Sequence, residues 1–520
     1  MSMIPVQKSK RKKRRYVWPI TNRMILMVAL GVIEFLLLYN VFHYFQSKAP
    51  WIEEALNLAS AVIILLLVTR SKHLSSDMLW ILLIVLMPVF GTAMYLFLSG
   101  NLFISGTFRS IQESTLDARK YFKQDPEVLE EMCNENPELK GQFRYLAESS
   151  KAPFYRNEGF EYYPSGEAGF PRMLEELRKA EKFIFLEYFI VEEGEMWFSI
   201  LDILEEKAAQ GVDVRVMYDD LGSIGTLPPS YVHELEKKGI KAITFNRINP
   251  ILNIIMNHRD HRKIMVIDGK VAFSGGINLA DEYINQKERF GYWKDNVMMV
   301  KGEAVWSYTV LFLTNWNALR KEDTDYTKFK AEFEPVKKHD GYVSAYGETP
   351  FDDDLTSQNV YLNIINQAND YVYIATPYLI VDTEMLNALI LAAKRGVDVR
   401  IITPGIPDKK IVWFITRSFY SQLVEGGVKI YEYTPGFIHS KVFVSDDVTA
   451  TVGTINLDYR SLYLHFENGT YLYGSKKVLE VKDDMVKTIE ESHRMEKKEC
   501  DQGVVWTLVV SIIRLFAPLM

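Results

Sequence analysis

The sequence predicts a duplicated α/β protein: two copies of a mixed sheet flanked by helices form one pseudo-twofold body, preceded by N-terminal transmembrane helices. The segment GVDVR occurs at residues 211–215 and again at 396–400, a spacing of 185 residues. The pattern His-x-Lys-x4-Asp also occurs twice, at matching places in the two copies. Three apolar runs occupy much of the first hundred residues. A repeat of this kind indicates two structurally equivalent halves.

The composition limits the classes of protein to which the chain can belong. A chain of 520 residues with 48% hydrophobic and 24% charged residues is typical of a folded protein with two to four domains. Its formal charge of −7 argues against a nucleic-acid binder with a broad basic face, because phosphate affinity comes mostly from Lys and Arg. Only Cys133 and Cys500 are present, which excludes a disulfide framework, zinc fingers and iron–sulfur clusters.

The first hundred residues have the pattern of a membrane segment. Residues 8–15 contain seven basic residues out of eight, and apolar runs follow at 24–45, 55–69 and 78–98. The third run is long enough to cross a bilayer, the second is short, and the first carries Glu34. Three consecutive runs favour membrane insertion over buried core helices, so we expect a multi-pass protein of the cell membrane. Three full spans would place the rest of the chain outside the cytoplasm, and one re-entrant or interfacial helix would reverse that placement.

The remaining chain divides into four parts. Residues 101–152 are charged and resemble a linker with a short helix. Residues 153–335 and 336–500 hold the two α/β copies. Residues 501–520 are strongly apolar with a single Arg514, which favours an interfacial helix lying on lipid over a buried helix.

Each copy contains the same strand–helix–strand pattern. In the first copy, KFIFLEYFIV at 182–191 is followed by an amphipathic stretch and then by GVDVRVMYDD at 211–220. In the second, YVYIATPYLIV at 371–381 precedes GVDVRIITPG at 396–405 in the same way. A βαβ unit of this kind predicts parallel pairing of its two strands.

The candidate site residues stand at equivalent positions in two longer segments, HRKIMVIDGKVAFSGGIN and HSKVFVSDDVTATVGTIN. Of nine histidines, only two are followed by Lys two positions later, and both also have Asp at seven and Asn at seventeen. Side chains alternate along a strand, so His and Lys share one face, and the following glycine-rich turn allows close approach to a ligand. The alternative for a single copy, a surface turn after a strand, explains the pair poorly. The equivalent residues are His261 and His439, Lys263 and Lys441, Asp268 and Asp446, Gly276 and Thr454, and Asn278 and Asn456.

These residue types suit a phosphodiester. A neutral imidazole can attack phosphorus, and a second, protonated imidazole can protonate the departing oxygen. Paired lysines and asparagines can hold the non-bridging oxygens and the charge that develops on them. Because the protein itself supplies positive charge, we expect no metal ion and no cofactor, and no His/Asp/Glu cluster stands at metal-ligand spacing in the sequence.

The duplicated H-x-K-x4-D pattern resembles that of the phospholipase D superfamily, and the chain is most similar to its bacterial cardiolipin synthases. The similarity covers nearly the whole chain after residue 55. It rests on YDDLGS (218–223), NHRDHRKIMVIDG (257–269), SGGINLADEY (274–283), YWKD (292–295), PGIPDKK (404–410), YEYTPGFIHSK (431–441), GTINLDYRS (453–461), FEN (466–468) and PVFGTAMYLFLSG (88–100).

The resemblance implies a reaction and roles for these residues. One phosphatidylglycerol would be attacked by His261, releasing glycerol, and a second would take the phosphatidyl group to give cardiolipin, with His439 as acid and base. The partners would be two phosphatidylglycerol molecules and the lipid bilayer, without nucleic acid. The resemblance further implies phosphate binding by Lys263, Lys441, Asn278 and Asn456, substrate contact at Gly276 and Thr454, support of the catalytic geometry by Asp268 and Asp446, and imidazole-orienting carboxylates in Asp295 and Glu467.

Some residues depart from the family pattern. Residues 24–45 add an apolar segment to the two that are usual. His258, Asp260 and His465 stand where such enzymes often carry asparagine. For His258 and His465, as for His233, we expect ordinary structural roles, because lone histidines rarely act without a partner.

Proteins with other functions also carry two copies of the His-x-Lys-x4-Asp pattern. A nuclease would need a basic groove and no membrane anchor, and a non-catalytic scaffold would have lost a His or Lys, whereas both triplets are intact. A phospholipase D-type hydrolase or another phosphatidyltransferase, such as a phosphatidylserine synthase, stays open as the alternative. A membrane-anchored, dry site favours transfer to a lipid alcohol over transfer to water. The sequence leaves the oligomeric state and the use of phosphatidylethanolamine open.

Overall fold

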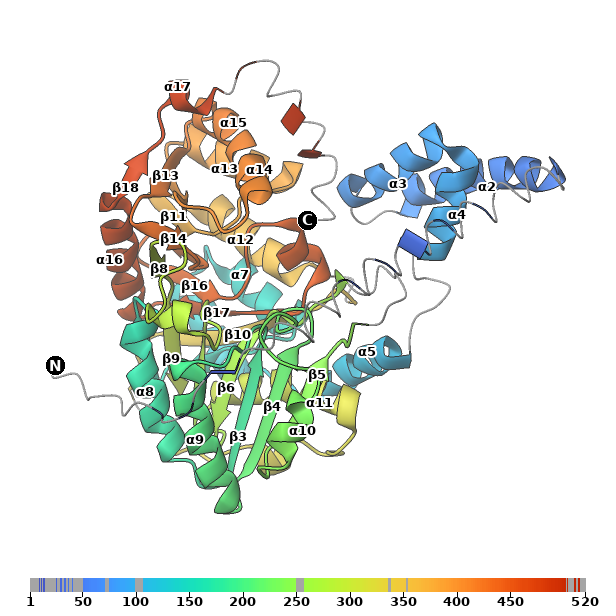
Figure 1. The fold of residues 1–520 in the computed structure, drawn as a ribbon. Coiled ribbons are helices and arrows are strands. Elements are labelled where there is room, and N and C mark those ends of the chain that lie inside the picture. The colour runs from blue at the N-terminus through green and yellow to red at the C-terminus, as the bar shows by residue number, and fades with distance from the viewer. Residues whose placement is uncertain are drawn as a thin grey trace.

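The computed structural model describes residues 50–70, 74–98, 106–248, 257–334, 338–351 and 354–501, with scattered positions before and after them. Figure 1 shows two α/β layers stacked on each other, with a small group of helices, α2 to α4, to one side.

The first half is built on a seven-stranded mixed sheet. Its central strands are apolar and buried on both faces, as expected for strands covered by helices. β3, β4 and β5 pair in parallel and the others pair antiparallel. In order across the sheet, the strands are β2 (Gly159–Tyr163), β9 (Val297–Lys301), β7 (Val271–Gly275), β6 (Lys263–Ile267), β3 (Phe183–Tyr188), β4 (Asp213–Asp219) and β5 (Lys241–Phe245). Its helices are α8 (Gly166–Arg178), α9 (Glu195–Ala209), α10 (Tyr231–Glu236) and α11 (Val305–Arg320).

The second half repeats this order and adds one strand at each edge. The nine strands are β1 (Tyr155–Arg156), β10 (Tyr342–Glu348), β17 (Glu467–Tyr473), β16 (Thr449–Gly453), β15 (Val442–Ser445), β11 (Tyr371–Ala375), β12 (Asp398–Pro404), β13 (Lys429–Tyr433) and β18 (Ser492–Arg494). Its helices are α12 (Thr356–Gln367), α13 (Thr383–Lys394), α14 (Lys410–Ser418), α15 (Tyr420–Glu425), α16 (Lys477–Glu490) and α17 (Lys497–Cys500). The shared strand order confirms the predicted duplication of a mixed α/β unit.

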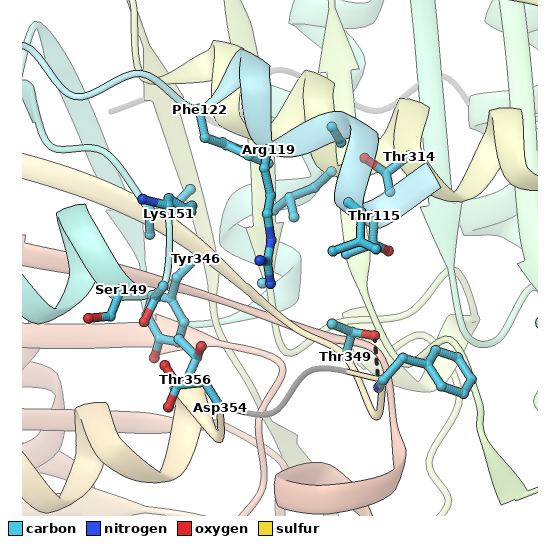
Figure 2. Close-up of a pocket in the computed structure, with 18 of the residues that line it drawn as sticks. Thr115, Arg119, Phe122, Ser149, Lys151, Thr314, Tyr346, Thr349, Asp354 and Thr356 are labelled. Atoms are coloured by element: carbon cyan, nitrogen blue, oxygen red, sulfur yellow. Dashed lines mark hydrogen bonds between the residues drawn. The ribbon is translucent and has the colours of Figure 1, made fainter. Parts of the chain in front are cut away.

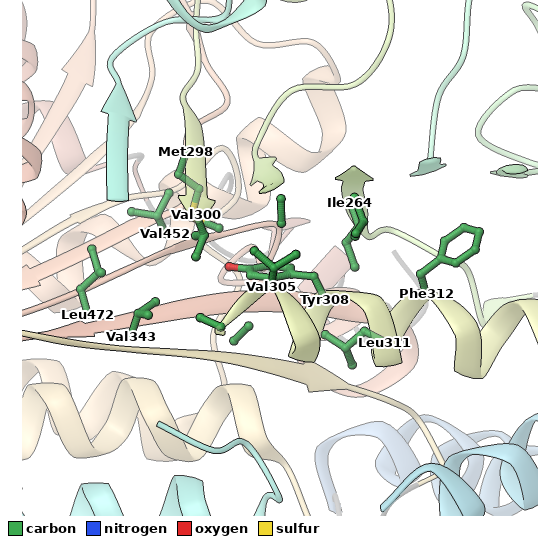
Figure 3. Packing of buried hydrophobic residues seen from close by; sticks show 14 of the residues in the cluster. Ile264, Met298, Val300, Val305, Tyr308, Leu311, Phe312, Val343, Val452 and Leu472 are labelled. Carbon is green, nitrogen blue, oxygen red and sulfur yellow. The ribbon is translucent and has the colours of Figure 1, made fainter. Parts of the chain in front are cut away.

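The two sheets are joined by one hydrophobic core. Helix α11 lies in this core and is buried on almost every side, and the hydroxyls of its buried Thr309 and Thr314 donate to carbonyls of the same helix. Figure 3 shows residues of α11, Val305, Tyr308, Leu311 and Phe312, among side chains from both sheets, including Ile264 and Leu472. The halves therefore form a single body.

Short backbone contacts also connect the halves beside the candidate site. β8 (Tyr292–Lys294) of the first half pairs in parallel with β14 (Gly436–Ile438) of the second. At the equivalent place, Asp260 forms a parallel bridge with Phe466. Each connection comes immediately before one of the two motif histidines and one of the two candidate orienting carboxylates.

Residues 101–152, expected to be a linker, contain packed helices from residue 106 onward. They are α5 (Gly106–Ala118), α6 (Pro126–Glu135) and α7 (Lys140–Arg144). The Ser114 hydroxyl of α5 donates to the carbonyl of Thr314 in α11, at 2.8 Å. Apolar side chains such as Phe108 and Phe143 are buried in the cores of the body, which holds this segment in place.

The N-terminal apolar runs form α2 (Pro50–Arg70), α3 (Leu74–Leu86) and α4 (Pro88–Leu98), packed around Ile63, Leu67 and Ile84. The third run is divided because Pro88 begins a new helix, leaving helices of 13 and 11 residues. In the part of the chain that the structure describes, no helix has both the length and the apolar character needed to cross a membrane. The prediction of N-terminal transmembrane helices is thus not supported here. Most of 24–45, with Glu34, and most of 501–520 lie outside the described residues.

Candidate active site

One cavity between the halves collects the polar residues that the sequence pattern singles out. Its volume is about 330 Å³, and both motif histidines line it, together with Asn278 and Asn456. Its walls combine aromatic side chains with charged ones. The other lining residues are Phe189, Ile190, Tyr283, Arg289, Phe290, Trp293, Tyr378, Ile380, Asp408, Lys409, Val412, Phe437, Asp458, Arg460 and His465.

Each motif histidine is held by the opposite half of the chain. Nδ1 of His261 lies 2.8 Å from Oε1 of Glu467, and the backbone N–H of His261 donates to the carbonyl of Phe466 at 2.8 Å. Nδ1 of His439 lies 2.7 Å from Oδ2 of Asp295, and its backbone N–H donates to the carbonyl of Lys294 at 2.7 Å. A carboxylate at Nδ1 holds the ring proton there and leaves Nε2 as the nitrogen able to react.

The motif lysines lie beside the histidines and are almost fully buried. Nζ of Lys263 donates to the carbonyl of His261 at 2.6 Å, and Lys441 makes the same contact with His439. Burial lowers the pKa of Lys263 to about 8 and that of Lys441 to about 7. Their charge is therefore sensitive to pH near neutrality and to an arriving anion.

Burial and neighbouring cations also favour neutral imidazoles. The pKa of His261 is well below its ordinary value because of burial and then the charges of Lys263 and Lys441. Burial and Lys441 lower the pKa of His439 to about 4, against the opposing effect of Asp295. Burial acts to raise the pKa of Asp295, but His439 and Lys441 outweigh it, so the net shift is downward. The resting site thus holds neutral histidines, one of them beside an ionised Asp295.

The two asparagines differ in their hydrogen bonding. Oδ1 of Asn278 accepts from the backbone N–H of Ile190 at 3.0 Å, and its Nδ2 donates to the hydroxyl of Tyr283 at 2.8 Å. Nδ2 of Asn456 has only a long contact of 3.5 Å with Asp458, and its buried Oδ1 has no partner among the described residues. Asn456 is therefore the asparagine with an acceptor left for a ligand.

The equivalent positions Gly276 and Thr454 contact the two carboxylates. A Cβ atom at Gly276 would lie only 1.8 Å from Oδ1 of Asp295, so the carboxylate occupies the space that a side chain would need. In the other half, the Thr454 hydroxyl donates to Glu467. The two positions shape the carboxylate environments differently, and neither lines the cavity.

Asp268 and Asp446 also lie away from the cavity. Each stands at a positive φ, 54° and 53°, in the turn after the motif strand. The Asp268 carboxylate accepts three backbone N–H groups, from residues 181–183, and Asp446 accepts three from residues 369–371. Both join the end of the motif strand to the start of the neighbouring strand.

Asp219, in the segment YDDLGS, has a role that the sequence did not indicate. Its carboxylate accepts the backbone N–H groups of Leu221, Gly222 and Asp260, the last at 3.0 Å. Burial raises its pKa to about 7. It ties the end of β4 to the residue before His261, a contact across 41 positions that no local pattern reveals.

The other singled-out histidines separate into two groups. His258 packs outside the cavity with Nδ1 2.9 Å from the carbonyl of Leu464, and His233 lies exposed on α10. His465, by contrast, lines the cavity. Donor atoms of His261, His465 and Glu467 lie within 4.8 Å of one another, a set that could hold a metal ion and that their separation in the sequence conceals.

A second cavity of about 330 Å³ lies elsewhere in the body, between α5 and residues 345–356 (Figure 2). Arg119, Lys151, Tyr346 and Thr349 are among its lining residues, and it contains neither motif histidine. It meets the motif only at Arg262, whose guanidinium donates to backbone carbonyls, including that of Glu467 at 3.2 Å.

Comparison with known proteins gives consistent results. A family profile described as "Cardiolipin synthase, PLD-like domain" matches residues 173–305 and 361–489, and one described as "Phospholipase_D-nuclease N-terminal" matches 55–100. The chain is 32% identical to a cardiolipin synthase of Halalkalibacterium halodurans, over 94% of this chain and 99% of that one. It is 34% identical to a cardiolipin synthase of Alkalihalophilus pseudofirmus, over 87% and 90%.

Two further relatives extend the comparison. An uncharacterised protein of Streptococcus mutans is 45% identical over 88% of this chain and 99% of its own length. Among solved structures, a phosphatidylserine synthase of Haemophilus influenzae shares the fold, with a TM-score of 0.55 and 16% identity, over 72% of this chain and 97% of that one.

Proposed function

This chain belongs to the cardiolipin synthase family of the phospholipase D superfamily, and we propose that its central cavity makes cardiolipin and glycerol from two phosphatidylglycerol molecules. The protein is a phosphatidyltransferase. The observation that carries the proposal is the reciprocal arrangement in which Glu467 holds His261 and Asp295 holds His439, each across the boundary between the halves.

In the first step, Nε2 of His261 attacks the phosphorus of one phosphatidylglycerol. A P–N bond forms, the P–O bond to the headgroup breaks, and His439 protonates the departing glycerol oxygen. In the second step, a hydroxyl of the second phosphatidylglycerol gives its proton to His439 and attacks phosphorus. The P–N bond breaks, which frees His261 and completes cardiolipin.

The electrostatics of the cavity suit this sequence of events. An arriving phosphodiester brings negative charge to a place where the pKa values of both lysines are depressed, so substrate binding favours protonated Lys263 and Lys441. The same anion offsets the cations that lower the pKa of His439, which promotes its charged, proton-donating form. Substrate binding thus prepares the acid that the first step requires.

Water competes with the lipid alcohol for the phosphatidylated histidine. Aromatic side chains of Phe189, Trp293 and Phe437 line part of the cavity and favour the exclusion of water from that part. They support transfer over the alternative, a phospholipase D-type hydrolase.

Detergent-purified protein incubated with phosphatidylglycerol alone, in chelator, tests the proposal by mass spectrometry of the lipids and of free glycerol. Equimolar cardiolipin and glycerol are expected. Phosphatidic acid as the main product would instead make the protein a hydrolase, and activity restored only by a divalent ion would contradict catalysis by the protein's own cations.

We further propose that the protein works at a membrane through α2–α4. Apolar side chains of these helices are exposed, which indicates a surface for lipid. They include Leu58, Val62, Leu65, Val68, Val85 and Leu86.

Contacts between the basic N-terminus and the first half of the body indicate on which side of the membrane each lies. Nε of Arg11 lies 2.5 Å from Oδ1 of Asp202, and the backbone N–H of Arg14 donates to Glu193 at 3.0 Å. We propose that Arg11 and Arg14 occupy the same side of the bilayer as the catalytic body. Membrane-impermeant labelling of single cysteines placed at Ser9 and at Lys321 should reach both from one side, and labelling from opposite sides would refute this placement.

A further inference from the structure

We infer that His465 and Asn456 form a subsite that binds a hydroxyl of the incoming polyol headgroup and so selects the acceptor. The inference rests on the proposed transferase function and adds a specificity-determining residue to it. It assigns His465 a role toward substrate, in contrast to the structural role expected from the sequence.

The imidazole of His465 is buried but unpartnered. The residue is 7% exposed, and neither ring nitrogen has a hydrogen-bond partner in the described part of the chain. Its nearest charged neighbour is Glu467, with Nδ1 and Oε1 3.9 Å apart, too far for a hydrogen bond. Buried polar groups are almost always satisfied, so an open pair of nitrogens at a cavity indicates a ligand.

Its position places this open pair beside the reacting centre. His465 lines the same cavity as the two motif histidines, and its ring centroid lies 5.8 Å from that of His261. Asn456, with its unpartnered Oδ1, lines the cavity as well. A headgroup attached to the second lipid would meet these groups as it approaches the phosphatidylated His261.

The chemistry of the two groups matches a hydroxyl. A neutral imidazole offers one N–H donor and one acceptor nitrogen. The Asn456 carbonyl adds a second acceptor. A hydroxyl both donates and accepts, whereas an ammonium group only donates and would leave the His465 N–H unsatisfied. The vicinal diol of a glycerol headgroup offers one hydroxyl to attack and one to bind here.

A metal ion is the alternative to a hydroxyl as the ligand of His465. His261, His465 and Glu467 could act as ligands. However, Glu467 already contacts Nδ1 of His261 and accepts from Thr454, so an ion would have to displace both contacts. This favours a neutral hydroxyl over a cation.

The decisive measurement is the partition of the phosphatidyl group between cardiolipin and phosphatidic acid in His465→Ala, His465→Asn and the control His233→Asn. We expect His465→Ala to release glycerol but to shift the product ratio toward phosphatidic acid by at least about tenfold. His465→Asn, which keeps a donor and an acceptor, should recover part of the ratio, and His233→Asn should match the wild type. An unchanged ratio in His465→Ala, or chelator-sensitive activity that depends on His465, would overturn the subsite.

A second measurement needs no variant. Wild-type protein given equal concentrations of 1,2-propanediol and 2-aminoethanol as competing acceptors should phosphatidylate the diol preferentially, and equal use of both would overturn the inference. Absence of cardiolipin synthesis by the wild type would refute the proposed function itself. Normal synthesis with an unselective acceptor site would refute only the subsite.

Discussion

His261 and Glu467 lie 206 positions apart in the chain, yet Nδ1 of the imidazole is 2.8 Å from the carboxylate. The same relationship joins His439 to Asp295 in the opposite direction. The duplicated halves therefore exchange carboxylates, and neither half by itself contains a motif histidine together with the carboxylate that contacts it. Both contacts lie beside the cavity that the two histidines line, and the shared core holds the halves in the relative position that the contacts require.

Removing either exchanged carboxylate should impair catalysis without unfolding the protein. Glu467→Gln keeps the shape and a hydrogen-bonding oxygen but loses the charge that stabilises a protonated ring. We expect turnover to fall by about 10²–10⁴-fold, measured as cardiolipin formed per folded protein. The same loss is expected for Asp295→Asn, and full activity in either variant would show that the contact is not used.

Gly276→Ala should act through Asp295. The added Cβ would lie 1.8 Å from Oδ1 of that carboxylate, which must move away from His439. We expect a loss of activity similar to that of Asp295→Asn. Gly141→Ala in α7 is the matched control, because nothing lies within 4 Å of its added Cβ. Equal activity of the two variants would show that Asp295 can move without cost.

The low pKa values of the motif lysines predict that substrate binding depends on pH. Lys441 has a pKa of about 7, so it is protonated below that pH and loses its charge as the pH rises through it. Binding of the anionic lipid should weaken on the alkaline side, seen as a rising KM above about pH 7. Lys441→Arg, which keeps its charge, should flatten this rise if it stays active, whereas Lys394→Arg on the exposed face of α13 should not. A KM independent of pH would contradict the role.

Asp268 should matter for stability more than for chemistry. Its carboxylate accepts three backbone N–H groups at 2.7–2.8 Å and lies away from the cavity. Asp268→Asn should lower the free energy of unfolding by about 1–3 kcal/mol, with activity per folded molecule largely kept. Exposed Asp117→Asn serves as the control for thermal unfolding. Lost activity at unchanged stability would place Asp268 in the chemistry after all.

The duplication could be predicted because the same short sequence patterns occur in both halves. The two GVDVR segments begin β4 and β12, which occupy equivalent places in the two sheets. Other features depend on contacts between distant residues and leave no local signal. The pairing of β8 with β14 and the bond from Asp219 to the backbone of Asp260 are of this kind.

Histidine patterns alone could not separate His465 from His258. Both stand singly in the sequence, without a lysine two positions later. The fold turns His258 toward the carbonyl of Leu464 and leaves His465 open to the cavity. For the third apolar run, hydropathy did not register the break that Pro88 introduces, which leaves helices of 13 and 11 residues in place of one span.

The most direct test of the shared site is to find the histidine that carries the phosphatidyl group. Protein with His439→Asn, incubated with phosphatidyl-p-nitrophenol, whose phenolate can leave without a proton from His439, and then quenched and digested, should yield a peptide phosphatidylated at His261, because the base that would activate the second alcohol is missing. Adding Glu467→Gln should reduce this adduct. An adduct on another residue, or full cardiolipin synthesis by the His439→Asn protein, would contradict a single site built from both halves.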